Sequence, residues 1–146
     1  MDYLSAFDVS ASGMAVQRVR LDTVALNLAN AYTTRGVDGG PYRKMEVVLA
    51  ERSPAEFERH LFQGTKASSA LGVEVADIRA RELAPRMVYE PGHPDADANG
   101  YVAYPNIEPV SEMLTLIEAT RAYEANVKAI AAAKSMAMRA LEIGGR

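Results

Sequence analysis

Mostly apolar residues recur at alternating intervals of three and four along the first thirty positions, from Phe7 to Ala31. This spacing places them on one broad face of an α-helix, so the sequence predicts a helix over residues 5–30. Further aliphatic residues fall outside that face and indicate a second packing partner. They are Val9, Val16, Val19 and Leu26.

The same alternation returns near the C-terminus, between Met113 and Leu141. Pro109 suits the first turn of a helix, and Gly144 suits its end. The sequence predicts a helix over residues 108–143, about 52 Å long at about 1.5 Å per residue. A helix of this length is too long to be an internal element of a compact 146-residue domain. We therefore expect the two terminal helices to pair as an antiparallel coiled coil. The expected partners are Leu21, Val24 and Leu28 against Tyr123, Val127 and Ile130.

The middle of the chain has a different pattern. Short runs of β-branched and aromatic residues predict strands at residues 45–51, 72–79, 86–90 and 101–104, and residues 36–41 have turn chemistry. A capping-box pattern that starts at Ser53 predicts a short helix over residues 54–62. The predicted fold class is therefore α+β. A helical stem, residues 1–34 with 107–146, holds a small β-rich unit, residues 35–106.

Composition narrows the classes of function. The 146 residues carry a net charge of −3, which gives no reason to expect a nucleic-acid binder. No cysteine is present, so disulfides, thiol nucleophiles and cysteine-based metal sites are excluded. No apolar run approaches the length of a membrane span, and Asp2 stands where a secretory signal has basic residues, so we expect no cleaved signal peptide.

The candidate chemistry is sparse. Residues 95–100 match the opening of a calcium loop, but position 12 is Asn106 in place of a bidentate carboxylate. We therefore expect a polar turn in which Gly100 takes a positive φ. His60 and His93 have no second ligand at helical spacing, so surface or capping roles are expected. We predict no catalytic residue, no metal site and no cofactor.

Two signatures in the sequence resemble those of the flagellar rod and hook axial proteins. The N-terminal signature is carried by residues 27–31 after Ser12, Gly13 and Met14, and the C-terminal signature by residues 122–126 after Glu112 and Met113. In the middle, residues 41–43, 72–77, 88–92 and 97–102 are similar to the proximal rod proteins of the bacterial flagellar basal body. The stretch near residues 52–71 departs from the family in length and helical character, which leaves its role open.

The resemblance implies a non-enzymatic subunit that is exported without signal cleavage and polymerises in the periplasm into the torque-transmitting rod. The implied partners are copies of itself, the rod subunits FlgB, FlgF and FlgG, FliE, and the membrane ring at the rod base. The residues expected in helix packing and assembly are Met14, Leu21, Val24, Asn27, Leu28, Asn30, Met113, Tyr123, Asn126, Val127 and Ile130. Asn27 and Asn30 are candidates to fix the helix register, and Asn30 alternatively to end the helix.

Without the resemblance, the residues are also compatible with two other classes of protein. One is a stand-alone helical-hairpin adaptor or chaperone, and the other is a small calcium-dependent or hydrolytic enzyme. A rod subunit is distinguished by terminal helices that are only marginally stable before assembly, because one packed interface per helix leaves apolar residues in water. We therefore expect fast amide exchange near residues 5–30 and 112–140 of the monomer, and slower exchange near residues 72–104.

Overall fold

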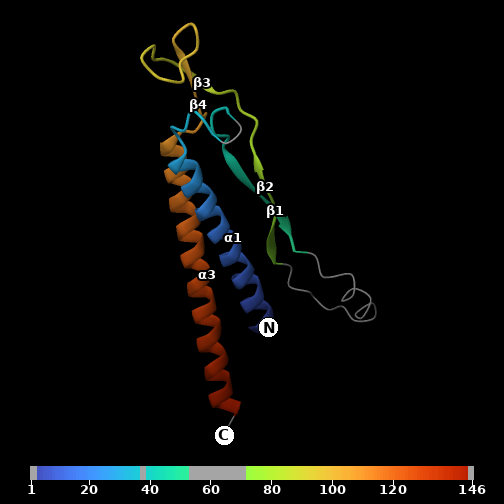
Figure 1. Cartoon of the computed structure of the whole chain (residues 1–146). Coiled ribbons are helices and arrows are strands. Elements are labelled where there is room, and N and C mark those ends of the chain that lie inside the picture. Colours follow the sequence, from blue (N-terminus) through green and yellow to red (C-terminus); the bar gives the residue numbers. More distant parts are fainter. Residues whose placement is uncertain (1–2, 37–38, 53–71, 145–146) are drawn as a thin grey trace, which may run out of the picture. The chain divides into compact units, whose positions relative to one another are not determined.

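The computed structural model describes residues 3–36, 39–52 and 72–144, with side chains from Ser5 onward (Figure 1). Its elements are α1 (Tyr3–Ala29), β1 (Met45–Glu51), β2 (Val73–Ala80), β3 (Arg86–Tyr89), β4 (Tyr101–Tyr104) and α3 (Pro109–Gly144). The terminal helices and the strands between them confirm the α+β class. The short helix expected at residues 54–62, with His60, lies outside the described residues.

The contacts divide the chain into two compact units, and both terminal helices contribute to each. Unit 1 contains Met1–Val19, Leu49–Ala76 and Ala119–Arg146, and unit 2 contains Arg20–Val48 and Asp77–Glu118. Strands β1 and β2 are hydrogen-bonded to each other, as are β3 and β4. Neither helix, over its described length, is apolar enough to cross a membrane.

Unit 2 has its core beside the β3–β4 hairpin. The hairpin is antiparallel and pairs Val88 with Val102 and Tyr89 with Tyr101. Because side chains alternate across a strand, Val88 and Val102 share one face, and Val102 is fully buried. Tyr89 and Tyr101 share the other face, where both are exposed and their rings meet edge to face at 5.4 Å. The other buried apolar residues of unit 2 are Val24, Ala31, Pro105 and Ile107.

The loop between β3 and β4 is the polar turn that the sequence predicts. The Asp97 carboxylate accepts hydrogen bonds from the backbone N–H groups of Asn99 and Tyr101, at 2.8 and 2.9 Å. Gly100 has a φ of 81°, which confirms its expected positive value. A Cβ at Gly100 would lie 2.9 Å from the Tyr89 ring, so glycine is needed there for both backbone conformation and space.

Unit 1 has a smaller described core. Its buried apolar residues are Val16, Ala119 and Ala133. Val16 is 2% exposed, so our expectation that it lies outside the packed face of the helix is wrong. Val9 and Leu26, from the same set, are exposed as expected. Val16 is buried because the packed face of the helix is broader than a single row of residues and includes positions beside that row.

Ser12 ties α1 to the start of β2 within unit 1. Its hydroxyl accepts a hydrogen bond from the backbone N–H of Val73 at 3.2 Å and donates one to the carbonyl of Val9 at 2.8 Å. A Cβ at Gly72 would lie 2.5 Å from the Ser12 oxygen, so the close approach of this strand to the helix needs glycine.

Candidate functional site

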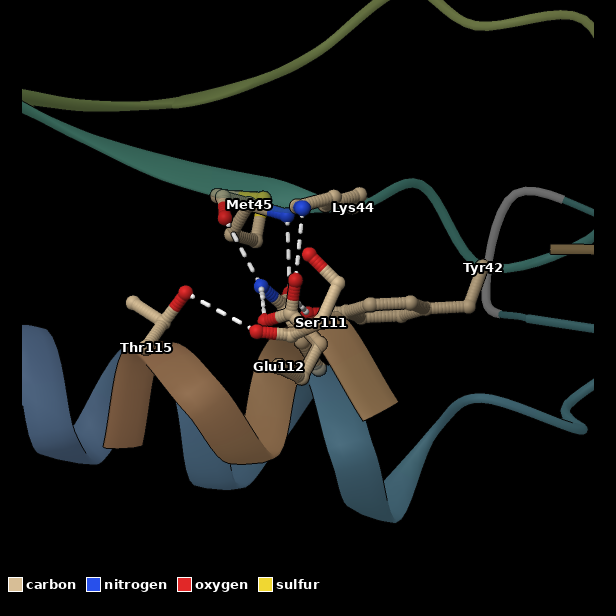
Figure 2. A network of polar contacts seen from close by, with 7 residues as sticks. Tyr42, Lys44, Met45, Ser111, Glu112 and Thr115 are labelled. Carbon is tan, nitrogen blue, oxygen red and sulfur yellow. Dashed lines mark hydrogen bonds and ion pairs between the residues drawn. The ribbon is translucent and has the colours of Figure 1, made fainter. Parts of the chain in front are cut away.

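The side chain of Asn27 lies at a buried junction of α1, β1 and α3 in unit 2, and Figure 2 shows the residues around it. Asn27 is 1% exposed. Its amide nitrogen donates to the carbonyl of Met45 at 2.9 Å, and its amide oxygen accepts from the N–H of the same residue at 2.8 Å. The side chain thus pairs with both backbone groups of the first residue of β1, as a neighbouring strand would.

The remaining hydrogen-bonding capacity of Asn27 is also used. Its amide nitrogen donates to Glu112 Oε2 at 3.1 Å, and its amide oxygen accepts from the Tyr42 hydroxyl at 3.1 Å. A carboxamide has two N–H donors and one oxygen with two lone pairs, so all four sites are filled. A fully satisfied buried network specifies one arrangement of the segments that it joins.

Glu112 carries the charge at this junction. It is 2% exposed and stands in the first turn of α3, where the helix dipole favours a negative charge. Its Oε1 forms an ion pair with the Lys44 ammonium, whose side chain keeps partial access to solvent (Figure 2). Two oxygens held by two different partners offset the cost of burying a carboxylate.

The same surroundings affect Tyr42. Burial raises the pKa of its hydroxyl above the usual value of 10.0, and the nearby negative charge of Glu112 raises this pKa further. Both effects disfavour the phenolate, so Tyr42 stays protonated and able to donate to Asn27.

A second contact joins the two helices within unit 1. A Cβ built at Gly13 would lie 3.0 Å from both the amide nitrogen and the oxygen of Asn126. The Asn126 amide donates to the carbonyl of Ala122 at 2.9 Å, which holds it beside Gly13. A side chain at position 13 would require the Asn126 amide to shift, so glycine suits this close contact between the helices despite its cost in helix propensity.

The register that we expected between the helices is wrong. Leu21, Val24 and Leu28 were expected to face residues from Tyr123 onward, but Asn27 is bonded to Glu112, which precedes Tyr123 by eleven positions. At about 1.5 Å per residue this is an axial difference of about 16 Å. The periodicity defines which face of each helix packs, but it repeats every few residues and so leaves the axial position undetermined.

The other predicted assembly residues occupy several kinds of position. Val24 is buried, Met14, Leu21, Leu28, Asn126 and Ile130 are half-buried, and Met113, Tyr123 and Val127 are exposed. Asn30 lies just beyond the end of α1, where its amide donates to the carbonyl of Leu26 at 2.9 Å. This contact matches the helix-ending role that the sequence offered for Asn30.

The sequence did not identify the residues of the junction as partners. Glu112 and Tyr42 were noted only within signatures, Met45 only as the first residue of the predicted strand 45–51, and nothing marked Lys44. Two features of the sequence point toward the junction: an asparagine among the apolar residues of the first helix, and an acidic residue in the first turn of the second helix. Neither signal identifies its partner, because the partners come together only in the folded unit.

An exposed apolar stripe runs along the first turns of α3. It consists of Val110, Met113, Leu114 and Ile117, each at least half exposed. At about 100° per residue, Val110, Leu114 and Ile117 lie on the opposite side of the helix from the buried Glu112, and Met113 lies at the edge of this stripe. Exposed apolar residues gathered on one helix face mark a surface for a protein partner.

Two family models match the two ends of this chain, and full-length relatives match it over nearly its whole length. The family model "Flagella basal body rod protein" matches residues 7–35, and "Flagellar basal body rod FlgEFG protein C-terminal" matches residues 98–143. The flagellar basal-body rod protein FlgC of Salmonella typhimurium is 39% identical over 145 residues, with 99% of each chain covered. FlgC of Bacillus subtilis is 43% identical over 150 residues with the same coverage, and FlgC of Aquifex aeolicus is 42% identical over 142 residues, 97% of each chain.

The chain belongs to the FlgC family of flagellar basal-body rod proteins. It is a structural subunit of the bacterial flagellar basal-body rod, associates with other rod components and serves motility. The FlgC family is structural and not enzymatic. The two family models cover most of α1 and α3, including Asn27 and Glu112 at the junction.

The calcium-loop residues have structural partners in this FlgC-family chain. Asp95 accepts a hydrogen bond from the Thr34 hydroxyl at 2.8 Å and lies 3.7 Å from the Arg35 guanidinium. His93 accepts a hydrogen bond from the backbone N–H of Asp95 at 3.1 Å, a capping role. Within the described parts of the chain, no three acidic or histidine side chains are grouped as metal ligands would be.

Proposed function

We propose that this subunit enters the proximal part of the rod through its terminal helices, which pair as an antiparallel coiled-coil stem formed by residues 1–34 with 107–146. The spacing of the two helix contacts supports this proposal. From Gly13 to Asn27 is fourteen residues on α1, and from Glu112 to Asn126 is fourteen on α3. Fourteen residues are two heptads, so the paired contacts recur at the period of a coiled coil, in opposite chain directions.

The predicted assembly residues have distinct roles in this proposal. Half-buried and buried positions such as Leu21 and Val24 hold the stem together, and Asn27 fixes its register through Glu112. Exposed positions such as Met113, Tyr123 and Val127 contact neighbouring subunits. Stacked helices that are packed on several faces are stiff, which a shaft that transmits torque requires.

The exposed apolar stripe of α3 is the single observation that carries the assembly role. Leu114 is 56% exposed, and it is flanked on the same side of the helix by Val110 and Ile117. A stand-alone adaptor has no need to leave such a stripe in water, whereas a rod subunit buries it against its neighbours. The alternative of a helical-hairpin adaptor is therefore not favoured.

The proposed setting is the periplasmic rod, reached through the flagellar export apparatus without cleavage of a signal peptide. The proposed partners are further copies of this chain, the rod subunits FlgB, FlgF and FlgG, FliE, and the membrane ring at the rod base. These assignments rest on the resemblance to rod and hook axial proteins, and the marginal apolar balance of the helices is compatible with export in an unfolded form.

The assembly role is tested by placing a charge in the stripe. We expect Leu114→Asp to leave the purified protein folded, because the side chain is exposed, yet to prevent incorporation into basal bodies and abolish motility. Ser111→Asp is the matched control, since it adds the same carboxylate at an exposed polar position beside the stripe. Normal swimming and normal rod content in the Leu114→Asp strain would contradict the proposal.

A further inference from the structure

We propose that the exposed methionines of α3 are modification sites, at which a peroxide oxidises the thioether to the sulfoxide before assembly and so keeps the subunit out of the rod. They are Met113, Met136 and Met138, which are 51, 53 and 55% exposed. A peroxide dissolved in water reaches the sulfur of such a side chain directly, whereas packing shields a buried one. The proposal rests on the assembly role of the exposed apolar residues of α3, and it assigns that surface a sensitivity to oxidation.

The neighbours of these methionines are also apolar and exposed. Met113 lies at the edge of the stripe, directly before Leu114 and four positions before Ile117, and both of those are more than half exposed. Met138 lies three positions before Leu141, so the two side chains are neighbours on the helix surface, and Leu141 is 75% exposed. The unbranched thioether is apolar and adapts to the shape of a partner, so methionine suits an interface for as long as its sulfur is reduced.

Oxidation removes that suitability. In the reaction with hydrogen peroxide, a sulfur lone pair attacks one oxygen, an S–O bond forms and the O–O bond breaks. The departing hydroxide takes the remaining proton and leaves as water, so the sulfur loses two electrons and the peroxide gains them. The product is a polar side chain whose oxygen accepts hydrogen bonds from water. Covering this oxygen with an apolar partner removes those hydrogen bonds and therefore opposes assembly.

The other described methionines provide controls within the same chain. Met14 and Met45 are half-buried in the packing of the subunit itself, so a peroxide reaches them less readily. Met87 on β3 is 51% exposed but lies outside α3. It separates exposure from position, because we expect it to be oxidised in the monomer as readily as the methionines of α3, but without an effect on assembly.

Peptide mapping by mass spectrometry after brief treatment with dilute hydrogen peroxide tests the sites. In the purified monomer we expect Met113, Met136 and Met138 to form sulfoxide about fivefold faster than Met14 and Met45. In isolated basal bodies, where neighbouring subunits cover the three α3 positions, we expect their rates to fall about tenfold. Equal rates at the exposed and half-buried methionines of the monomer, or unchanged rates in basal bodies, would overturn the proposal.

The effect on assembly is measured in cells that lack the enzymes that reduce methionine sulfoxide. The subunit is made before the export apparatus is induced and receives a pulse of hydrogen peroxide, and catalase removes the peroxide before rods form. We expect the sulfoxide fraction at the three α3 positions to be about tenfold lower in basal bodies than in the unassembled subunit of the same cells. We expect the sulfoxide fraction at Met87 to be the same in both.

The matched variant replaces Met113, Met136 and Met138 by leucine, which conserves size and apolar character. We expect it to enter the rod equally well with and without the pulse. Equal sulfoxide fractions at the α3 positions of assembled and unassembled subunit, or loss of incorporation of the leucine variant after the pulse, would overturn the proposal. If the variant fails to assemble even without peroxide, the sulfoxide fractions of the unmodified chain decide.

The assembly role is judged separately, in cells that receive no peroxide. If the unmodified chain is absent from their basal bodies, the assembly role fails, whatever oxidation does.

Discussion

Asn27 and Glu112 are 85 positions apart in the chain, and a 3.1 Å hydrogen bond joins their side chains. Through this bond and the pairing of Asn27 with Met45, the end of α1, the start of β1 and the start of α3 meet at one buried point. The junction therefore sets where the C-terminal helix lies along the N-terminal one within unit 2.

The first prediction concerns removal of the Asn27 amide. Asn27→Ala leaves both backbone groups of Met45 and one oxygen of Glu112 without their partner in a buried site. A fully buried unsatisfied group costs about 1–3 kcal/mol, and the two groups of Met45 cost less because they are only part-buried, so we expect the free energy of unfolding to fall by about 2–4 kcal/mol. Urea unfolding followed by circular dichroism measures the change.

Asn106→Ala is the control for that experiment. Asn106 is exposed and its amide makes one hydrogen bond to a backbone carbonyl, so its loss costs about 0.5–1 kcal/mol. Similar unfolding midpoints for the two variants would mean that the junction does not stabilise unit 2.

The second prediction is a loss of stability at alkaline pH. The pKa of Tyr42 is raised above 10.0 in the folded protein, so in that range the folded state binds more protons than the unfolded state. The stabilisation is complete below pH 10 and is lost as the pH rises past 10 toward the folded pKa. We expect the urea midpoint to fall there in the unmodified protein.

Tyr42→Phe separates this effect from general alkaline unfolding. The variant is less stable at neutral pH, by about 1 kcal/mol, because Asn27 loses the hydrogen bond from the hydroxyl. Its midpoint falls less than that of the unmodified protein above pH 10. A parallel decline in both proteins would exclude Tyr42 as a source of the pH dependence.

The third prediction uses Gly13 and Asn126 as a pair. Replacing glycine by alanine inside a helix usually gains about 1 kcal/mol, but a Cβ at Gly13 would lie 3.0 Å from the Asn126 amide. We expect Gly13→Ala to reduce rod incorporation and swimming. Gly13→Ala combined with Asn126→Ala restores them, because the second change removes the obstructing amide.

The Asn126→Ala single variant completes this cycle. It keeps the glycine and the room around it, so it is expected to assemble. If the double variant were no better than Gly13→Ala alone, close packing of these two residues would not be needed for assembly.

The elements themselves were predictable from the sequence because local patterns encode them. The expected strand at residues 45–51 agrees with β1, and the helix expected over residues 108–143 agrees with α3 to within one residue at each end. The turn before Tyr101 was predictable because Asn99 and Gly100 have well-defined turn preferences. These features depend only on near neighbours in the chain.

The junction was not predictable from the sequence because it depends on distant partners. Asn27 was expected to fix the helix register, but the periodicity gave the wrong axial partner for its neighbours, and nothing near Lys44 marked it as the counter-ion of Glu112. The junction also changes the expected stability of the helices. Residues 20–29 and 112–118 belong to unit 2 and are tied to its core, so they are no longer expected to be loose in the monomer.

The remaining parts of the helices are expected to depend on assembly. In unit 1 the described apolar core is limited to Val16, Ala119 and Ala133, while Met136 and Leu141 near the end of α3 are exposed. Ordering each residue costs about 1–2 kcal/mol of backbone entropy, which so small a core offsets poorly. Burial against neighbouring subunits supplies the missing stabilisation.

Amide hydrogen exchange in a verified monomer, compared with the assembled rod, tests the central claim most directly. We predict slow exchange in the monomer for residues 20–29, 101–104 and 109–118, and fast exchange for residues 5–19 and 119–144, which become protected only in the rod. Equally slow exchange along the whole of both helices in the monomer would contradict coupling between folding and assembly, and would favour a stand-alone helical adaptor.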